Sequence, residues 1–125
     1  MMLIDGQGNA LYARARRWSI DDDHTRIDLT LGVIRADTGP DENPYMTVTS
    51  EPEDLARHAF TLATLKPGAT MTVSDGSAQG IGITNVDGTR YMVLARNAED
   101  VMGEVALERP QIERLVDDWL HSTGR

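Results

Sequence analysis

The sequence predicts an α+β fold, in which antiparallel β-strands form one or more sheets and two amphipathic helices cover them. Apolar and polar side chains alternate with a period of two along residues 25–36, which is typical of a strand with one buried face. Apolar residues recur at helical spacing in residues 55–63 and again in residues 112–120. Because a chain of 125 residues with 40% hydrophobic residues supports one core, we expect a single compact domain over residues 1–125.

The first strands follow a turn at residues 5–9, where glycine and asparagine are frequent. Residues 11–20 and 25–36 predict two strands joined by the polar turn 21–24, and therefore a hairpin. In the second of these strands the expected buried face consists of Ile27, Leu29, Leu31 and Val33, while Arg26, Asp28 and Thr30 lie on the opposite face.

A long loop is predicted at residues 37–44, followed by a short strand at 45–50. Ser50 and Glu53 have the spacing of a capping box, so a helix is expected to start there. The Lys66-Pro67-Gly68 run ends it. The apolar positions of this helix are Leu55, Ala59, Leu62 and Ala63.

The second half predicts more strands and a second helix. The strands are expected at 70–74, 80–86, 89–96 and 103–108. Asp87 and Gly88 indicate a two-residue hairpin turn, because type I′ turns need positive φ angles. Residues 96–103 read as a loop or a single helical turn. The second helix has apolar positions at Ile112, Leu115, Val116, Trp119 and Leu120.

The two halves share a pattern that suggests a tandem ββββα duplication with repeats at 9–66 and 67–121. A shift of 57 residues superposes the apolar helix positions, with His58 opposite Leu115 as the exception. The cap regions align at a shift of 58 instead, with Pro52 on Pro110 and Glu53 on Gln111. The alternative is one α+β sheet whose two helices resemble each other only because both are amphipathic.

Composition and charge narrow the class of protein. The net charge of −8 favours solubility, repels phosphate backbones and favours basic protein partners. The absence of cysteine excludes disulfides and thiolate chemistry. No signal peptide and no apolar run of about 20 residues is present, so we expect a cytoplasmic protein without membrane association.

No motif identifies a reaction. The histidines at positions 24, 58 and 121 are not spaced as metal ligands, and the acidic run 21–24 is interpreted as a solvated turn rather than a cation site. The glycine-rich run 76–82 lacks the lysine of a phosphate-binding loop. We therefore predict no cofactor and no metal, and an enzyme only in the form of an unrecognised small-molecule pocket between sheet and helices.

The strongest candidate for binding is a stripe of aromatic and arginine side chains on the strand 11–20. Alternation places these side chains on one face, and a neighbouring-strand arginine can join them. The candidate binding residues are Tyr12, Arg14, Arg16, Trp18 and Arg26. Tyr, Trp and Arg dominate protein interface hot spots, but they also suit single-stranded nucleic acid. The alternative to both is an ordinary solvated sheet face with Asp28 as a cross-strand partner.

These observations favour a small acidic, non-catalytic domain that binds another protein, such as an inhibitor, an immunity-type protein or a phage-encoded antagonist. A single-stranded DNA or RNA binder that uses the stripe is the alternative. Exposed sheet edges also allow a homodimer.

The order of strand-rich runs and capped helices over residues 10–121 resembles the Whirly-type arrangement of single-stranded nucleic-acid-binding proteins and the related dimeric coactivator domains. The resemblance is one of element order, because the lysine- and glycine-rich strand motif is absent. It implies two ββββα units and, by analogy, the nucleic-acid alternative.

Overall fold

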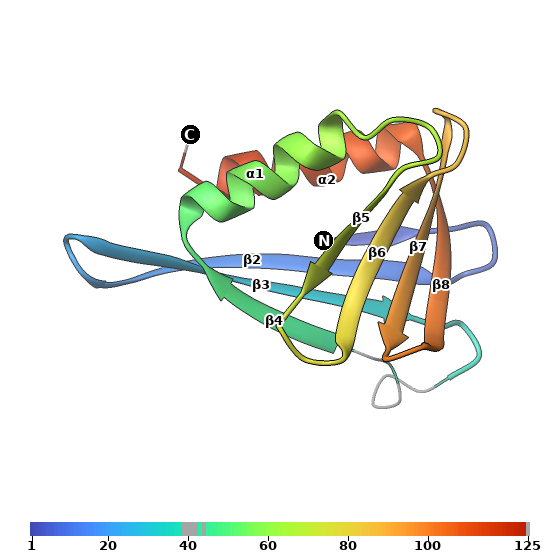
Figure 1. Ribbon diagram of the computed structural model, residues 1–125, viewed down its shortest axis with the longest axis horizontal. Helices are drawn as coiled ribbons and strands as arrows, with labels where there is room; N and C mark the ends of the chain where they lie inside the picture. The colour runs from blue at the N-terminus through green and yellow to red at the C-terminus, as the bar shows by residue number, and fades with distance from the viewer. Residues whose placement is uncertain (39–42, 44, 125) are drawn as a thin grey trace.

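The computed structural model describes residues 1–38, 43 and 45–124, and it confirms the predicted α+β class with two successive ββββα units (Figure 1). The first unit consists of β1 (Met2–Ile4), β2 (Ala10–Asp21), β3 (His24–Ile34), β4 (Tyr45–Ser50) and α1 (Pro52–Ala63). The second consists of β5 (Thr70–Ser74), β6 (Gln79–Asn85), β7 (Arg90–Asn97), β8 (Asp100–Glu108) and α2 (Arg109–Ser122). Part of the predicted loop 37–44 lies outside the described residues.

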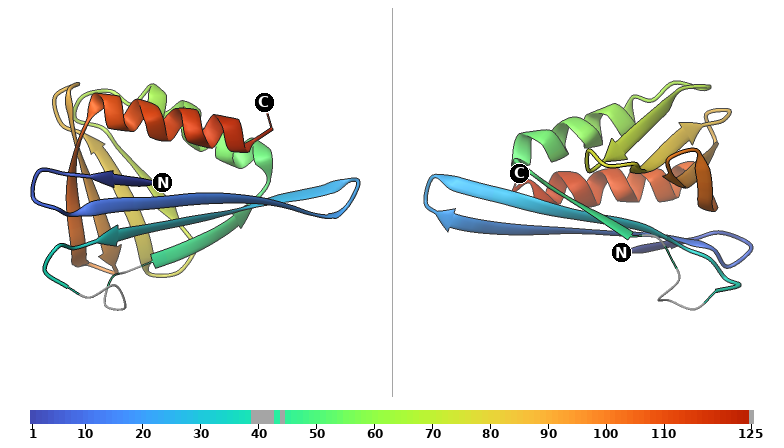
Figure 2. Two further views of the ribbon diagram at one scale, coloured as in Figure 1. Left: turned by 180° about the vertical axis from the view of Figure 1, so that it is seen from behind. Right: turned by 60° about the horizontal axis from the view of Figure 1, so that its bottom comes forward.

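Each unit forms its own antiparallel sheet, with strand orders β1-β2-β3-β4 and β5-β6-β7-β8. The two helices lie side by side along one face of the first sheet, where α2 packs over β2 and α1 over β3 (Figures 1 and 2). The strands of the second sheet run steeply across the same side of the molecule, and β7 and β8 contact β3. One face of the first sheet is therefore covered, while its other face is turned to solvent.

A hydrophobic core formed by the described residues joins the two units. The predicted inner face of β3 is confirmed, because Ile27, Leu29, Leu31 and Val33 are all buried. The apolar stripes of both helices enter the same cluster, in which Trp119 is the largest fully buried side chain. Neither α1 nor α2, the helices of the described residues, is long and apolar enough to cross a membrane.

Both helices begin with the same kind of cap, but not the one predicted from Ser50 and Glu53. The N-cap of α1 is Glu51, whose backbone N–H donates to Oδ2 of Asp54 at 3.2 Å. The N-cap of α2 is Glu108, whose N–H donates to Oε1 of Gln111 at 3.0 Å. The predicted pair was wrong by one residue because glutamate, an uncommon N-cap, occupies the position normally held by serine or aspartate.

The corrected caps make the two units more alike than the sequence indicated. Glu51 and Glu108 are separated by the same 57 residues that superpose the apolar stripes, so one shift aligns caps and buried faces. The shift of 58 came from aligning Pro52 with Pro110. These prolines are not equivalent, because Pro52 is the first residue of α1 and Pro110 is the second residue of α2.

The structure differs from the sequence prediction in three places. Residues 2–4 form β1 beside β2, ahead of the predicted repeat boundary at residue 9. The Asp87-Gly88 turn is longer than predicted, since Val86 bonds to Arg90 and Asp87 accepts hydrogen bonds from two following amides. Most of 96–103 is strand rather than loop, because β7 and β8 form a tight hairpin in which Ala98 adopts a φ angle of 54°.

His58 is the one position of the two apolar stripes that carries a polar residue, and we expect it to make the stability of the protein dependent on pH. Burial lowers the pKa of His58 below its ordinary value of 6.5, an effect that Asp54 partly opposes. The neutral imidazole is therefore favoured in the fold. The unfolded chain takes up the proton first as the pH falls, so this stabilisation is complete above pH 6.5 and is lost as the pH falls through the folded-state pKa.

We expect His58→Leu to remove this dependence, because Leu115 fills the equivalent position of α2 and is fully buried. Urea unfolding at pH 7.5 and pH 5.0 measures how much the free energy of unfolding changes between these two pH values. The wild-type protein should lose more free energy of unfolding between these values than the variant does. The exposed His121, changed to glutamine, is the control and should behave as wild type; an unchanged difference in His58→Leu would contradict the assignment.

Candidate interaction surface

The solvent-facing side of the first sheet carries all five residues predicted for binding. In the register of β2 and β3, Tyr12 pairs with Gly32, Arg14 with Thr30, Arg16 with Asp28, and Trp18 with Arg26. Arg14 and Arg16 are exposed, whereas Tyr12, Trp18 and Arg26 are partly buried. Leu11 and Ala13 lie on the covered face beneath α2 and are buried, as the alternation predicts. We call this solvent-facing side the outer face.

One end of the outer face is aromatic. Tyr12, Gly32 and Tyr45 lie in one cross-strand row, and the rings of Tyr12 and Tyr45 meet edge to face across the glycine, with centroids 5.9 Å apart. Met2 continues the row from β1. Tyr45 is 42% exposed and Met2 is 48% exposed, so this end offers apolar surface to a partner. Tyr45 and Met2 could not be predicted as part of this face, because the sequence alone does not give the pairing of their strands with the rest of the sheet.

The middle of the outer face holds an anion between cations. Asp28 lies opposite Arg16 and accepts a hydrogen bond of 2.7 Å from the hydroxyl of Thr49. The pKa of Asp28 lies below its ordinary value chiefly because of this bond, and further because of Trp18 and Arg16. Nε1 of Trp18 is buried and makes no hydrogen bond of ordinary geometry to a described residue.

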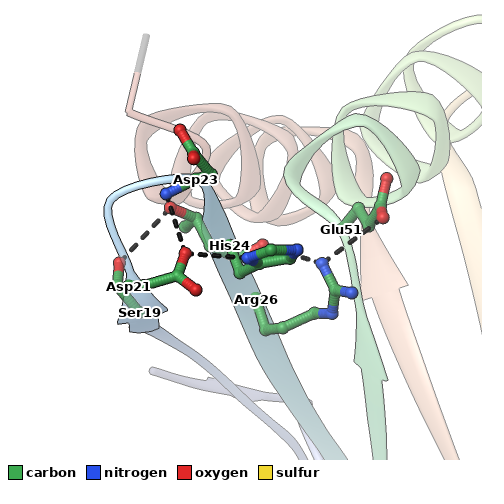
Figure 3. A network of polar contacts seen from close by, with 7 residues as sticks. Ser19, Asp21, Asp23, His24, Arg26 and Glu51 are labelled. Carbon is green, nitrogen blue, oxygen red and sulfur yellow. Dashed lines mark hydrogen bonds and ion pairs between the residues drawn. The ribbon is translucent and has the colours of Figure 1, made fainter.

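At the other end of the outer face, an ion pair joins the sheet to the start of α1. Arg26, beside Trp18, places Nη1 3.3 Å from Oε1 of Glu51, the N-cap residue (Figure 3). The charge of Arg26 is therefore partly neutralised. Arg14 and Arg16, by contrast, form no ion pair within 4 Å among the described residues. They are the cations of this face that remain available to a partner.

Arg17 belongs to the covered side of β2 and has a structural role. Its Nη1 donates to the carbonyl oxygen of Thr123 at 3.2 Å, at the end of α2. A cation at a helix C-terminus interacts favourably with the helix dipole. The sequence indicates this position, because Arg17 lies one residue after Arg16 and three after Arg14. Side chains alternate along a strand, so Arg17 points to the face opposite to theirs.

The β2–β3 hairpin extends beyond the helices as an arm (Figures 1 and 2). At its tip Asp21 accepts a 2.7 Å hydrogen bond from the ring of His24 and another bond from the amide of Asp23 (Figure 3). The His24 bond is the main reason why the pKa of Asp21 is lowered. The tip also exposes Ile20, which is 71% accessible.

A small pocket lies where the two sheets meet. Its volume is about 180 Å³, and it sits between β4 and the ends of β6 and β7. The buried side chains of Met46, Ile81 and Ala95 line it together with amide and guanidinium groups. Its described lining contains no carboxylate or imidazole. Across the described residues, no group of three or more His, Cys, Asp or Glu is placed to hold a metal ion.

No protein-family model, no curated protein and no solved structure matches this chain. The fold therefore defines the class: an α+β protein built from two ββββα units, with two helices packed on one face of the first sheet and the other face of that sheet open to solvent.

Proposed function

We propose that this protein is a non-catalytic protein-binding domain and that its outer face, carrying Tyr12, Arg14, Arg16, Trp18 and Arg26, contacts the partner. The observation that carries the proposal is the position of Arg14 and Arg16. Both are exposed and unpaired among the described residues, and they lie next to an exposed aromatic cluster on an otherwise acidic protein. Aromatic anchors beside arginines are typical of protein interface hot spots.

Single-stranded nucleic acid is the second candidate, favoured by the same residue types, but the details of the outer face support it less. Asp28 is held as an anion in the path that phosphates would follow between Arg16 and Arg26. The ring of Tyr12 is engaged by the edge contact with Tyr45, and Nε1 of Trp18 is buried. Stacking platforms need open ring faces and an uninterrupted basic groove.

The test is affinity capture with two charge-matched double variants. The wild-type protein, Arg14→Glu with Arg16→Glu, and Arg96→Glu with Arg114→Glu are each immobilised and exposed to an extract of the source cells. Both double variants change the net charge equally, but Arg96 and Arg114 are exposed residues of β7 and α2 and do not belong to the first sheet.

We expect one stoichiometric partner to be recovered by the wild-type protein and by the Arg96/Arg114 variant and to be lost from the Arg14/Arg16 variant. Equal recovery by all three proteins would contradict the proposal. Retention of labelled single-stranded oligonucleotides that weakens steeply between about 50 and 200 mM salt would instead favour the second candidate.

A further inference from the structure

Most of β2 forms a sheet edge that no described strand covers. β1 pairs only with residues 10–12 of β2, whereas β3 pairs with β2 along nearly its whole length. Beyond Ala13, which exchanges two hydrogen bonds with Met1, the side of β2 away from β3 has no neighbouring strand among the described residues. An open edge of this kind is a template for an additional strand.

The alternation of hydrogen-bonding directions along a strand shows which backbone groups of β2 face this edge. Ala13 directs both its N–H and its C=O toward Met1, at 3.0 and 2.7 Å. In an antiparallel sheet alternate residues direct these groups to opposite sides. The N–H and C=O groups of Ala15, Arg17 and Ser19 therefore face the open edge, while those of the intervening residues bond to β3.

The side chains along the open edge have a pattern that selects a partner strand. Arg14 and Arg16 project from the outer face two residues apart, a separation of roughly 6.6–6.8 Å along a strand. Alternate residues of an added strand would lie directly opposite them, with Cβ atoms about 4.5–5.5 Å away. Carboxylates at two such alternate positions would neutralise both guanidinium groups.

The same pattern disfavours a second copy of this chain at the edge. A two-fold antiparallel pairing centred on Ala15 sets Arg14 against Arg16 of the other copy. Centring on Arg16 or on Arg17 sets that arginine against itself. Like charges directly opposite each other destabilise a sheet, so these three registers are disfavoured for a second copy, and the part of the edge beside Arg14 and Arg16 favours an acidic strand.

We propose that an extended acidic segment of a partner protein adds as a strand beside residues 14–19 of β2, with alternate carboxylates opposite Arg14 and Arg16. This inference rests on the proposed function in that the partner is a protein, and it adds the conformation and charge of the bound segment. Backbone hydrogen bonds would supply affinity, and the two arginines would select the sequence.

The probe is the synthetic peptide Thr-Glu-Thr-Glu-Thr-Glu-Thr, titrated into the ¹⁵N-labelled full chain and followed by NMR. We expect the amides of Ala15, Arg17 and Ser19 to shift and to become protected from hydrogen exchange on binding. The amides of Arg14, Arg16 and Trp18, bonded to β3, should be protected before and after. A peptide with lysine in place of glutamate should bind at least about tenfold more weakly.

Two further peptides test pairing through the backbone. One is N-methylated at every threonine and the other at every glutamate. Only one alternate set of amides can face β2, so one of these peptides should lose binding and the other should keep it; loss in the threonine set indicates an antiparallel strand. Equal binding by both would overturn the edge geometry.

Ala15→Pro provides a matched change in the protein. Proline removes an edge N–H that bonds to nothing in the sheet, so β2 and β3 should stay paired while the peptide affinity falls at least about tenfold. Circular dichroism verifies that the variant is folded, and the methylated peptides test the proposal even if it is not.

The outcomes separate this inference from the proposed function. If Arg14→Glu with Arg16→Glu loses the captured partner but the methylated peptides bind alike, the partner lies across the outer face and the edge proposal fails alone. Absence of saturable binding or of amide protection with the glutamate peptide also overturns it. A dimer of the free chain that Ala15→Pro dissociates would show that a second copy occupies the edge and would refute it as well.

Discussion

Replacing Trp119 with alanine is expected to lower the free energy of unfolding by about 3–5 kcal/mol. Trp119 is fully buried and is the largest such side chain in the core that joins both units. Its removal leaves a cavity that the surrounding elements can close only in part, because the helices are fixed by their caps and by each other. Urea unfolding followed by circular dichroism measures the loss.

A second change at this position separates packing from hydrogen bonding. Nε1 of Trp119 is buried without a hydrogen-bond partner among the described residues, so phenylalanine removes no bond. Trp119→Phe should therefore cost much less than Trp119→Ala. An alanine variant that loses less than about 1 kcal/mol would contradict the central position of Trp119 in the core.

Gly103→Ala is expected to destabilise the protein by about 1–3 kcal/mol, the usual cost of overpacking. Gly103 lies in β8 where the second sheet approaches the first. A Cβ atom at this position would come within 2.9 Å of Cγ1 of Val33 and 3.4 Å of Cγ of Arg35. Val33 is fully buried and stiff about χ1, so it cannot turn away and the strands must separate instead.

Gly82→Ala is the matched control for this prediction. Gly82 also lies in a strand of the second sheet, but a Cβ atom there would meet its nearest neighbour, Thr70, at 3.7 Å, an ordinary contact. The control should be neutral or slightly stabilising, because alanine reduces the entropy of the unfolded chain. Equal effects of the two substitutions would show that the close approach of β8 to β3 is not required.

The fold class could be predicted because its signals are local and periodic. The alternation in residues 25–36 and the apolar spacing of both helices depend only on which faces are buried. The short strand β1 could not be predicted in this way. Its three residues are too few to show a period, and they become a strand because β2 offers an edge to pair with.

The caps and turns show a different limit. Glu51 and Glu108 cap their helices although serine or aspartate is the usual choice, so propensity alone placed the first helix start one residue early. Ala98 takes a positive φ angle that a sequence reader expects of glycine or asparagine. In both cases the surrounding strands and helices fix a local geometry that the residue type does not reveal.

The outer face could be predicted in its composition but not in its chemistry. Parity alone places Tyr12, Arg14, Arg16 and Trp18 on one side of β2. Which arginines of the first sheet are free depends on long-range contacts. Arg26 on the outer face forms an ion pair with Glu51, and Arg17 on the covered side donates to Thr123. The open edge of β2 likewise appears only once the lengths of β1 and β3 are compared.

The central claim, that the outer face binds a partner protein, is tested most directly by the affinity of the captured partner for the two double variants. We predict that Arg14→Glu with Arg16→Glu binds about ten- to a hundredfold more weakly than the wild-type protein, as for charged groups in an interface. Arg96→Glu with Arg114→Glu should bind within about threefold of wild type, since surface changes outside an interface are nearly neutral. Equal weakening by both variants would show that bulk charge, and not this face, determines binding.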